Sequence, residues 1–104
     1  MDIIVHLVCL HPDTDAGEFE TWVREVDYRT CPKLPSVHSF SVQRTERPGH
    51  YFEIIQVTST ADFENDMQTA EFKGLAAAFD AMARVTNGYA GERLEPGYTR
   101  VQSG

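Results

Sequence analysis

Two segments of the chain carry bulky apolar side chains at both odd and even positions, and they limit the possible folds more than any other feature. They are residues 3–10, IIVHLVCL, and residues 51–57, YFEIIQV. A strand that is apolar on both parities is covered on both faces, as it is in the middle of a sheet. The chain is therefore expected to build a sheet with these two segments as its central strands.

Two other segments have apolar residues at helical spacing. The first follows a turn at residues 11–15, whose aspartates can supply an N-cap, ends at Cys31-Pro32, and has a stripe formed by Phe19, Trp22, Val23 and Val26. The second follows candidate N-caps at Thr60 and Thr69, is expected to stop at Asn87-Gly88, and has a stripe formed by Phe72, Leu75, Ala76, Phe79, Met82 and Ala83. These patterns predict two helical regions between strands.

The remaining segments complete a β-α-β-β-α-β order. Residues 37–44 have the alternating side-chain pattern of a strand with one apolar face, and residues 89–94 form a weaker last strand. This order is that of the ferredoxin-like α+β fold, a four-stranded antiparallel sheet with helices. Its first and third strands lie in the middle, in agreement with the two segments that are apolar on both parities.

The turn Arg47-Pro48-Gly49 joins the second and third strands into a hairpin. Pairing the hairpin symmetrically about Pro48 places Arg44 opposite Phe52 and Val42 opposite Ile54. In this register Glu53 lies on the opposite face from Val42.

Length and composition fit one domain over residues 1–104. The formal charge of -7 argues against a nucleic-acid partner, because binding to phosphates depends on clustered Lys and Arg. No apolar run is long enough for a membrane span, and the N-terminal residues lack the features of a signal peptide, so we expect a cytoplasmic protein. The only two cysteines, Cys9 and Cys31, fit neither a disulfide framework nor a zinc motif.

Arg24, Asp27 and Tyr28 are the first candidate site. On a helix they occupy positions i, i+3 and i+4, so a cation, a carboxylate and a phenol share one surface patch that can hold a polar ligand. The competing interpretation is a solvated helix face with an ion pair of little energetic value. The sequence leaves both interpretations open.

His6, His38 and Glu53 are further candidates, because an imidazole or a carboxylate on a strand can act as a general base. The alternative for His6 is a hydrogen-bonded core histidine. No His or carboxylate spacing predicts a metal site, and the glycines form no nucleotide-binding motif, so no cofactor is expected. The sequence alone assigns no residue a catalytic role.

The stretch Arg24-Glu25-Val26-Asp27-Tyr28, together with residues 30–37, TCPKLPSV, resembles the signature of the REDY-like (HapK-type) family. These small proteins are found with genes for prodigiosin-type tripyrrole pigments. The resemblance implies a dimeric α+β barrel, in which two sheets face each other across a two-fold axis. It also implies a role in making a pyrrole-derived secondary metabolite.

The resemblance leads to a small-molecule-binding accessory protein, a homodimer that holds a pyrrolic intermediate or assists a partner enzyme. In this hypothesis Tyr28 stacks on or hydrogen-bonds a ring, Asp27 accepts a pyrrole N–H, and Arg24 orients Asp27 or a ligand carboxylate. The alternative is a cofactor-independent enzyme that performs proton transfer or monooxygenation on an aromatic substrate, with His6, His38 or Glu53 as base. A structural interaction module is the third possibility.

Overall fold

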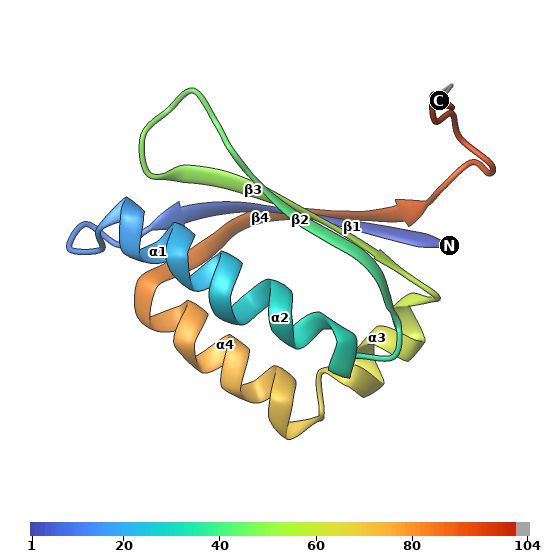
Figure 1. Cartoon of the computed structure of the whole chain (residues 1–104), viewed down its shortest axis with the longest axis horizontal. Coiled ribbons are helices and arrows are strands. Elements are labelled where there is room, and N and C mark those ends of the chain that lie inside the picture. The colour runs from blue at the N-terminus through green and yellow to red at the C-terminus, as the bar shows by residue number, and fades with distance from the viewer. Residues whose placement is uncertain (102–104) are drawn as a thin grey trace.

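The computed structural model describes residues 1–101 and contains one four-stranded antiparallel sheet with helices on one side (Figure 1). The strands are β1 (Asp2–Leu10), β2 (Val37–Arg44), β3 (His50–Val57) and β4 (Ala83–Glu92). The helices are α1 (Ala16–Trp22), α2 (Tyr28–Thr30), α3 (Thr60–Asp66) and α4 (Ala70–Met82). A π-helical turn, η1 (Val23–Asp27), and a 3-10 turn, η2 (Cys31–Lys33), make the first helical region continuous.

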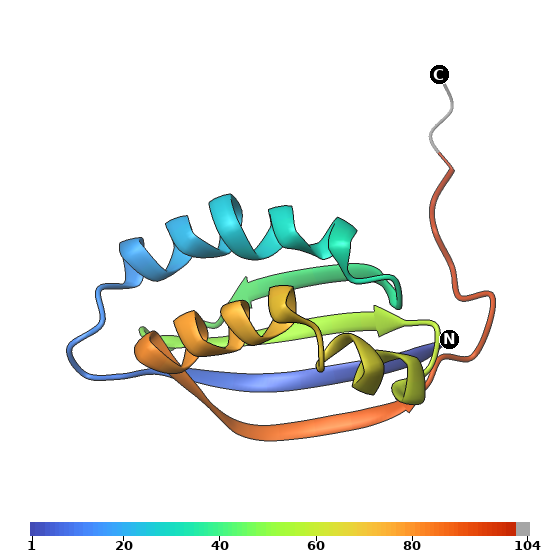
Figure 2. The same ribbon diagram turned by 90° about the horizontal axis from the view of Figure 1, so that it is seen from below.

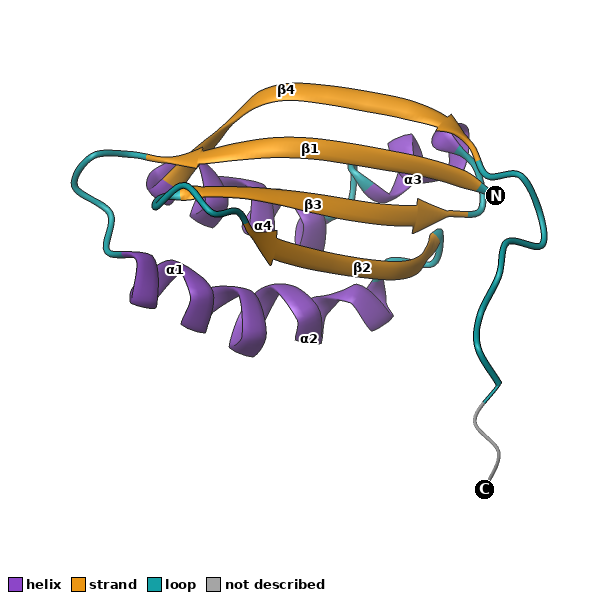
Figure 3. Ribbon diagram, turned by 90° about the horizontal axis from the view of Figure 1, so that it is seen from above, coloured by secondary structure: helices purple, strands orange, loops and turns teal. Residues whose placement is uncertain are grey.

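The strand order β2-β3-β1-β4 places β1 and β3 in the middle, as their two-sided apolar patterns predict. This order confirms the prediction of a ferredoxin-like α+β fold. All helices lie on the same face of the sheet (Figure 2). No element of residues 1–101 covers the opposite face (Figure 3).

The first helical region begins as predicted and then departs from α-helical geometry. The side chain of Asp15 caps α1 by accepting a hydrogen bond from the Glu18 amide at 3.0 Å. The π-helical turn η1 has more residues per turn than an α-helix, so the inward position passes from Val26 to Asp27. The prediction that Val26 belongs to the buried stripe is therefore wrong, since Val26 is 42% exposed and Asp27 is buried.

The hairpin between β2 and β3 has a different register from the symmetric one. Arg44 pairs with Tyr51 and Val42 pairs with Glu53, one residue away from the prediction. Pro48 and Gly49 are the central residues of a turn in which the His50 amide donates to the Arg47 carbonyl at 3.1 Å, and Gly49 has a φ of 77°. This turn is off-centre in the hairpin, so Glu53 faces the helices together with Val42.

A bulge interrupts β2 at its start. Val37 pairs with Val57 and Ser39 pairs with Gln56, which leaves His38 as the extra residue. The bulge turns Val37 to the same side as Phe40, where both pack against Ile55 and Val57. His38 is exposed.

The second helical region also differs from the prediction at both ends. Ser59, not Thr60, caps α3, whereas Thr69 caps α4 as predicted. The expected stop at Asn87-Gly88 is wrong, because α4 ends at Met82 and the backbone becomes extended at Ala83. The following β-branched pair Val85-Thr86 favours a strand, so the last strand begins at Ala83 and not at residue 89. It pairs with β1 on both sides of a register shift that leaves Thr86 unpaired.

The buried core has two parts on the helix-covered side of the sheet. One cluster is centred on Phe19 and contains Val8, Leu10, Phe19, Val23, Tyr51 and Ala83. The other contains Ile55, Val57 and Phe63. Between them the apolar side chains of α4 are only half-buried.

Replacement of Phe19 by Ala should destabilise the fold by about 3–5 kcal/mol, because this side chain is 1% exposed and contacts the rings of Trp22, Tyr51 and Phe79. Urea denaturation measures the change in the free energy of unfolding. The exposed Glu71, changed to Ala, serves as the control and should stay within about 0.5 kcal/mol of the wild type. Equal losses in both variants would contradict the placement of α1.

Candidate functional site

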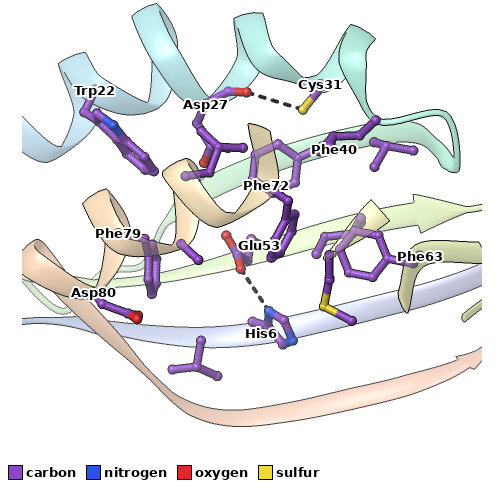
Figure 4. Close-up of a pocket in the computed structure, with 17 residues that line it drawn as sticks. His6, Trp22, Asp27, Cys31, Phe40, Glu53, Phe63, Phe72, Phe79 and Asp80 are labelled. Atoms are coloured by element: carbon purple, nitrogen blue, oxygen red, sulfur yellow. Dashed lines mark hydrogen bonds and ion pairs between the residues drawn. The ribbon is translucent and has the colours of Figure 1, made fainter. Parts of the chain in front are cut away.

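A cavity of about 200 Å³ lies between the helices and the middle of the sheet (Figure 4). Its walls are mostly apolar and aromatic, and its polar side chains come from β1, β3, η1, η2 and α4. The lining residues are His6, Trp22, Asp27, Cys31, Leu34, Val37, Phe40, Glu53, Ile55, Phe63, Met67, Phe72, Leu75, Ala76, Phe79, Asp80 and Val85.

Asp27 enters the cavity from the π-helical turn. The residue is only 9% exposed, and among the described residues no side chain or amide bonds to its carboxyl oxygens, which keep some contact with the open space of the cavity. Burial and, to a smaller extent, the nearby charge of Glu53 together raise the pKa of Asp27 to about 7. This carboxyl can therefore exist in either protonation state near neutral pH.

Glu53 and His6 form a pair on neighbouring central strands. The strand register places them directly opposite each other, and His6 Nδ1 lies 2.9 Å from Glu53 Oε1. Because a carboxylate only accepts hydrogen bonds, Nδ1 carries the proton and Nε2 of a neutral ring is a free acceptor. The Glu53 side chain is 12% exposed and that of His6 is 31% exposed.

The cavity is acidic. Asp27, Glu53 and Asp80 line it, whereas no Lys or Arg is among its lining residues. Such a site suits a ligand that donates hydrogen bonds or carries positive charge, because an anion would have to approach three carboxyl groups. The aromatic walls suit a flat ligand.

The structure separates the three residues of the predicted helical patch. Asp27 faces the cavity, whereas Arg24 and Tyr28 face a second groove of about 280 Å³ beside the edge strand β2. The Tyr28 hydroxyl accepts a hydrogen bond from the Val42 amide at 3.0 Å, and its ring meets that of Phe40 edge-on at 5.7 Å between centroids. The side chain of Arg24 is 63% exposed and lies near Glu20, at 3.8 Å.

Of the predicted site residues, the structure therefore brings together His6, Asp27 and Glu53. It places Arg24, Tyr28 and His38 elsewhere, with His38 outside both the cavity and the second groove.

The second groove is organised by Glu20. Its carboxylate accepts hydrogen bonds from Arg44 Nε and from the Tyr51 hydroxyl, at 2.9 and 2.8 Å. These bonds lower the pKa of Glu20 to about 2, chiefly through Arg44. The Glu20–Arg24 pair on the helix agrees with the i, i+4 spacing, but the stronger partner Arg44 comes from β2 and was not foreseen.

The sequence analysis also missed most of the aromatic wall. Trp22, Phe72 and Phe79 were assigned to helical stripes that pack in a core, yet they line the cavity. The sequence offers no signal that separates wall residues from core residues, because both occupy the same apolar helical stripes. Cys31 also reaches the cavity, where burial and the charge of Asp27 raise the pKa of its thiol to about 11, so it is a poor nucleophile at neutral pH.

Within residues 1–101, no cluster of three or more His, Cys, Asp or Glu side chains has the geometry to hold a metal ion. No helix in this part of the chain is long and apolar enough to cross a bilayer.

Comparisons with known proteins agree with this architecture. A family model described as REDY-like protein HapK matches residues 2–94. The crystal structure of HapK from Hahella chejuensis is 45% identical, with a TM-score of 0.91, and the match covers 97% of this chain and 100% of that one. Among curated proteins, none is significantly similar.

More distant structures share the fold. SnoaB from Streptomyces nogalater, described as a cofactor-independent oxygenase, has a TM-score of 0.70 at 19% identity, with 98% of this chain and 94% of that one covered. A protein from Chloroflexus aurantiacus, described as a putative antibiotic biosynthesis monooxygenase, has a TM-score of 0.75 at 8% identity, with 93% and 96% covered. At these identities the likeness concerns the fold alone.

Replacement of Asp27 by Asn should remove a pH dependence of stability. Between about pH 4 and pH 7 the unfolded chain has released the Asp27 proton while the folded state still holds it, so wild-type stability should fall as the pH rises, by at most ~1.4 kcal/mol per pH unit. The Asp27→Asn variant should have a flatter profile across this window. Urea denaturation at pH 4, 5, 6, 7 and 8 measures both, roughly one point per pH unit.

The control for this experiment is Asp13→Asn, which alters an exposed aspartate in the turn before α1. It should keep the wild-type profile. If Asp27→Asn also keeps that profile, Asp27 is ionised in the folded protein throughout the window, and the cavity is more polar than its lining suggests.

Proposed function

The chain belongs to the HapK family of REDY-like proteins, and on this premise we propose that it binds a small molecule as an accessory protein in the biosynthesis of a prodigiosin-like pyrrolic metabolite. The observation that carries the proposal is the acidic, aromatic-walled cavity. It would hold a pyrrole-type intermediate or present it to a partner enzyme.

The size and lining of the cavity support a small flat ligand. Its volume of about 200 Å³ lies below the ~300–1,000 Å³ of pockets for drug-sized molecules, so a compound of two small rings is a better match than a larger pigment. Trp22 and Phe79 line it from the two helices, and Phe40 lines it from β2. These rings can stack on a pyrrole system or meet its edge.

The carboxyl groups provide the polar recognition in this proposal. Asp27 and Glu53 accept hydrogen bonds from pyrrole N–H groups, and His6 Nε2 is a further acceptor. Tyr28 supports the wall through its edge-on contact with Phe40. Arg24 lines only the second groove, so we assign it no ligand contact.

An enzyme is the second candidate, and the His6–Glu53 pair favours it specifically. Glu53 fixes Nδ1 as the protonated nitrogen, which leaves Nε2 able to accept a proton from an N–H or O–H group of a bound ring. The fold likeness to SnoaB is compatible with such cofactor-independent chemistry. In a monooxygenase version, dioxygen would be the oxidant.

A second copy of the chain is the proposed partner for the uncovered face of the sheet. By strand alternation this face carries Ile3, Val5 and Leu7 from β1 and Phe52 and Ile54 from β3. An apolar sheet face without helices needs cover, and two identical faces related by a two-fold axis can cover each other. A homodimer would bring two cavities onto the outer sides of one barrel.

Binding of a bipyrrole aldehyde tests the main proposal. Titration followed by the fluorescence of Trp22, the only tryptophan, should give a saturable signal. Asp27→Asn and Glu53→Gln should each weaken binding by about 2- to 10-fold, the effect of one hydrogen bond to an uncharged group. Glu18→Gln changes an exposed carboxylate and should bind as the wild type does.

Dioxygen consumption and deuterium exchange, measured on the complex formed in this titration, separate the binding protein from the enzyme. If the wild-type protein binds the aldehyde, consumes no dioxygen and exchanges ligand protons for deuterium no faster than buffer alone does, it is a binder. Catalysed exchange that disappears in His6→Gln would favour the enzyme. Absence of any binding by the wild type would rule out the pyrrolic ligand.

Light scattering tests the dimer. The wild type should have about twice the chain mass of 11.7 kDa at micromolar concentration. Ile54→Glu places a charge on the uncovered sheet face, where Ile54 is 37% exposed, and should yield monomers. Val26→Glu makes the same kind of change at an exposed position on the helical side and should leave the dimer intact, whereas a monomeric wild type would refute the barrel.

A further inference from the structure

We infer that Gly88 is a positioning residue of the cavity, because its missing side chain leaves the space in which the His6 imidazole bonds to Glu53 and stays open to water. This inference deepens the proposed function and rests on it only for the role of His6 towards a ligand. The geometry itself belongs to three adjacent strands.

The strand registers place these residues in one row across the sheet. His6 on β1 pairs with Glu53 on β3 and with Gly88 on β4. On one side of the imidazole, Nδ1 reaches Glu53 at 2.9 Å. On the other side stands the backbone of Gly88.

A side chain at position 88 would meet the imidazole directly. A Cβ built on Gly88 would lie 3.2 Å from His6 Cδ2 and 3.9 Å from Nε2. The first distance is shorter than an ordinary carbon–carbon contact, so either the ring or strand β4 would have to move. Movement of the ring stretches or breaks its bond to Glu53.

Gly91 provides an internal comparison on the same strand. A Cβ built there meets nothing within 4 Å. The intrinsic preference of a strand for Ala over Gly is the same at both positions. The two sites differ in what an added Cβ would meet. At Gly88 it would meet the imidazole and, at an ordinary contact distance of 3.5 Å, the Val5 carbonyl oxygen, whereas Gly91 pairs with Ile3 and lies on the uncovered face of the sheet.

The position of β4 at the sheet edge explains how His6 reaches solvent. Every β4 residue after Ala83 is exposed, and α4 lies over the inner strands (Figure 2). The His6 side chain is 31% exposed, in contrast to 12% for Glu53. His6 is thus a half-open polar group of the cavity. Of the other titratable groups that line it, Asp80 is exposed, Cys31 and Glu53 are half-buried and Asp27 is buried.

This arrangement gives His6 a specific role. The imidazole can exchange protons with water at the edge of β4 while it stays bonded to Glu53 on the cavity side. Protons taken from or given to a ligand would then reach the solvent through His6. A larger residue at position 88 would cover the ring and turn it away from Glu53.

Side-chain nitrogen NMR tests the positioning role through the tautomer of His6, a property that overall stability does not move. At pH 8 the neutral His6 ring of the wild type should carry its proton on Nδ1. Gly88→Ala should shift the ring towards the Nε2-protonated form, whereas Gly91→Ala should keep the wild-type spectrum. An unchanged tautomer in a folded Gly88→Ala variant would overturn the inference.

A double-mutant cycle covers the case in which Gly88→Ala folds poorly. In the wild-type background Gly88→Ala should lower the Tm, because the added methyl group meets the ring. In a His6→Ala background the same change should cost nothing, since the ring is gone. Equal losses in both backgrounds would overturn the inference. Neither measurement needs a ligand, so failure of the pyrrole-binding proposal is distinguishable from failure here.

Discussion

The π-helical turn at Val23–Asp27 determines what the interior of this protein can do. Regular α-helical geometry would turn Val26 towards the sheet and complete an apolar core. The turn instead presents the carboxyl group of Asp27, whose burial without a hydrogen-bond partner among the described residues opposes ionisation. Val23 and Phe19, one and two turns earlier, are buried in the core cluster and fix the position of this turn.

The cavity exists because the core is divided. The cluster around Phe19 fills one end of the space beneath the helices, and the cluster around Phe63 fills the other. Between the two clusters, α4 contributes no fully buried side chain. The helix therefore covers the middle of the sheet without filling the space beneath it. The central strands place His6 and Glu53 there, where a filled core would carry two apolar residues. The division of the core thus accounts for both the open space and the polar groups that line it.

The sequence predicted the element order and the central strands because both follow from the spacing of apolar side chains. The local backbone geometry of each helix or strand sets this spacing. The prediction failed where a single residue shifts the periodicity, and at the end of α4, where the backbone becomes extended at Ala83. The π-helical turn exchanged Val26 for Asp27, the off-centre turn moved Glu53 to the helix side, and the bulge displaced His38. Each event depends on turn geometry or tertiary packing that residue type does not encode. The sequence therefore indicated His6, Asp27 and Glu53 as candidates, but it did not predict that they line one cavity.

The charge of the cavity bears on the choice between binder and oxygenase. Activation of dioxygen without a cofactor would require the substrate to become an anion beside Glu53 and Asp80, and beside Asp27 whenever that carboxyl is ionised. Two like charges about 4 Å apart repel by ~4 kcal/mol at an effective dielectric constant of about 20, and a protonated His6 would compensate for only one of them. A neutral ring with N–H groups meets no such barrier, because every carboxylate is then an acceptor for it. The electrostatics of the cavity therefore favour recognition of an intact pyrrolic donor over stabilisation of its anion.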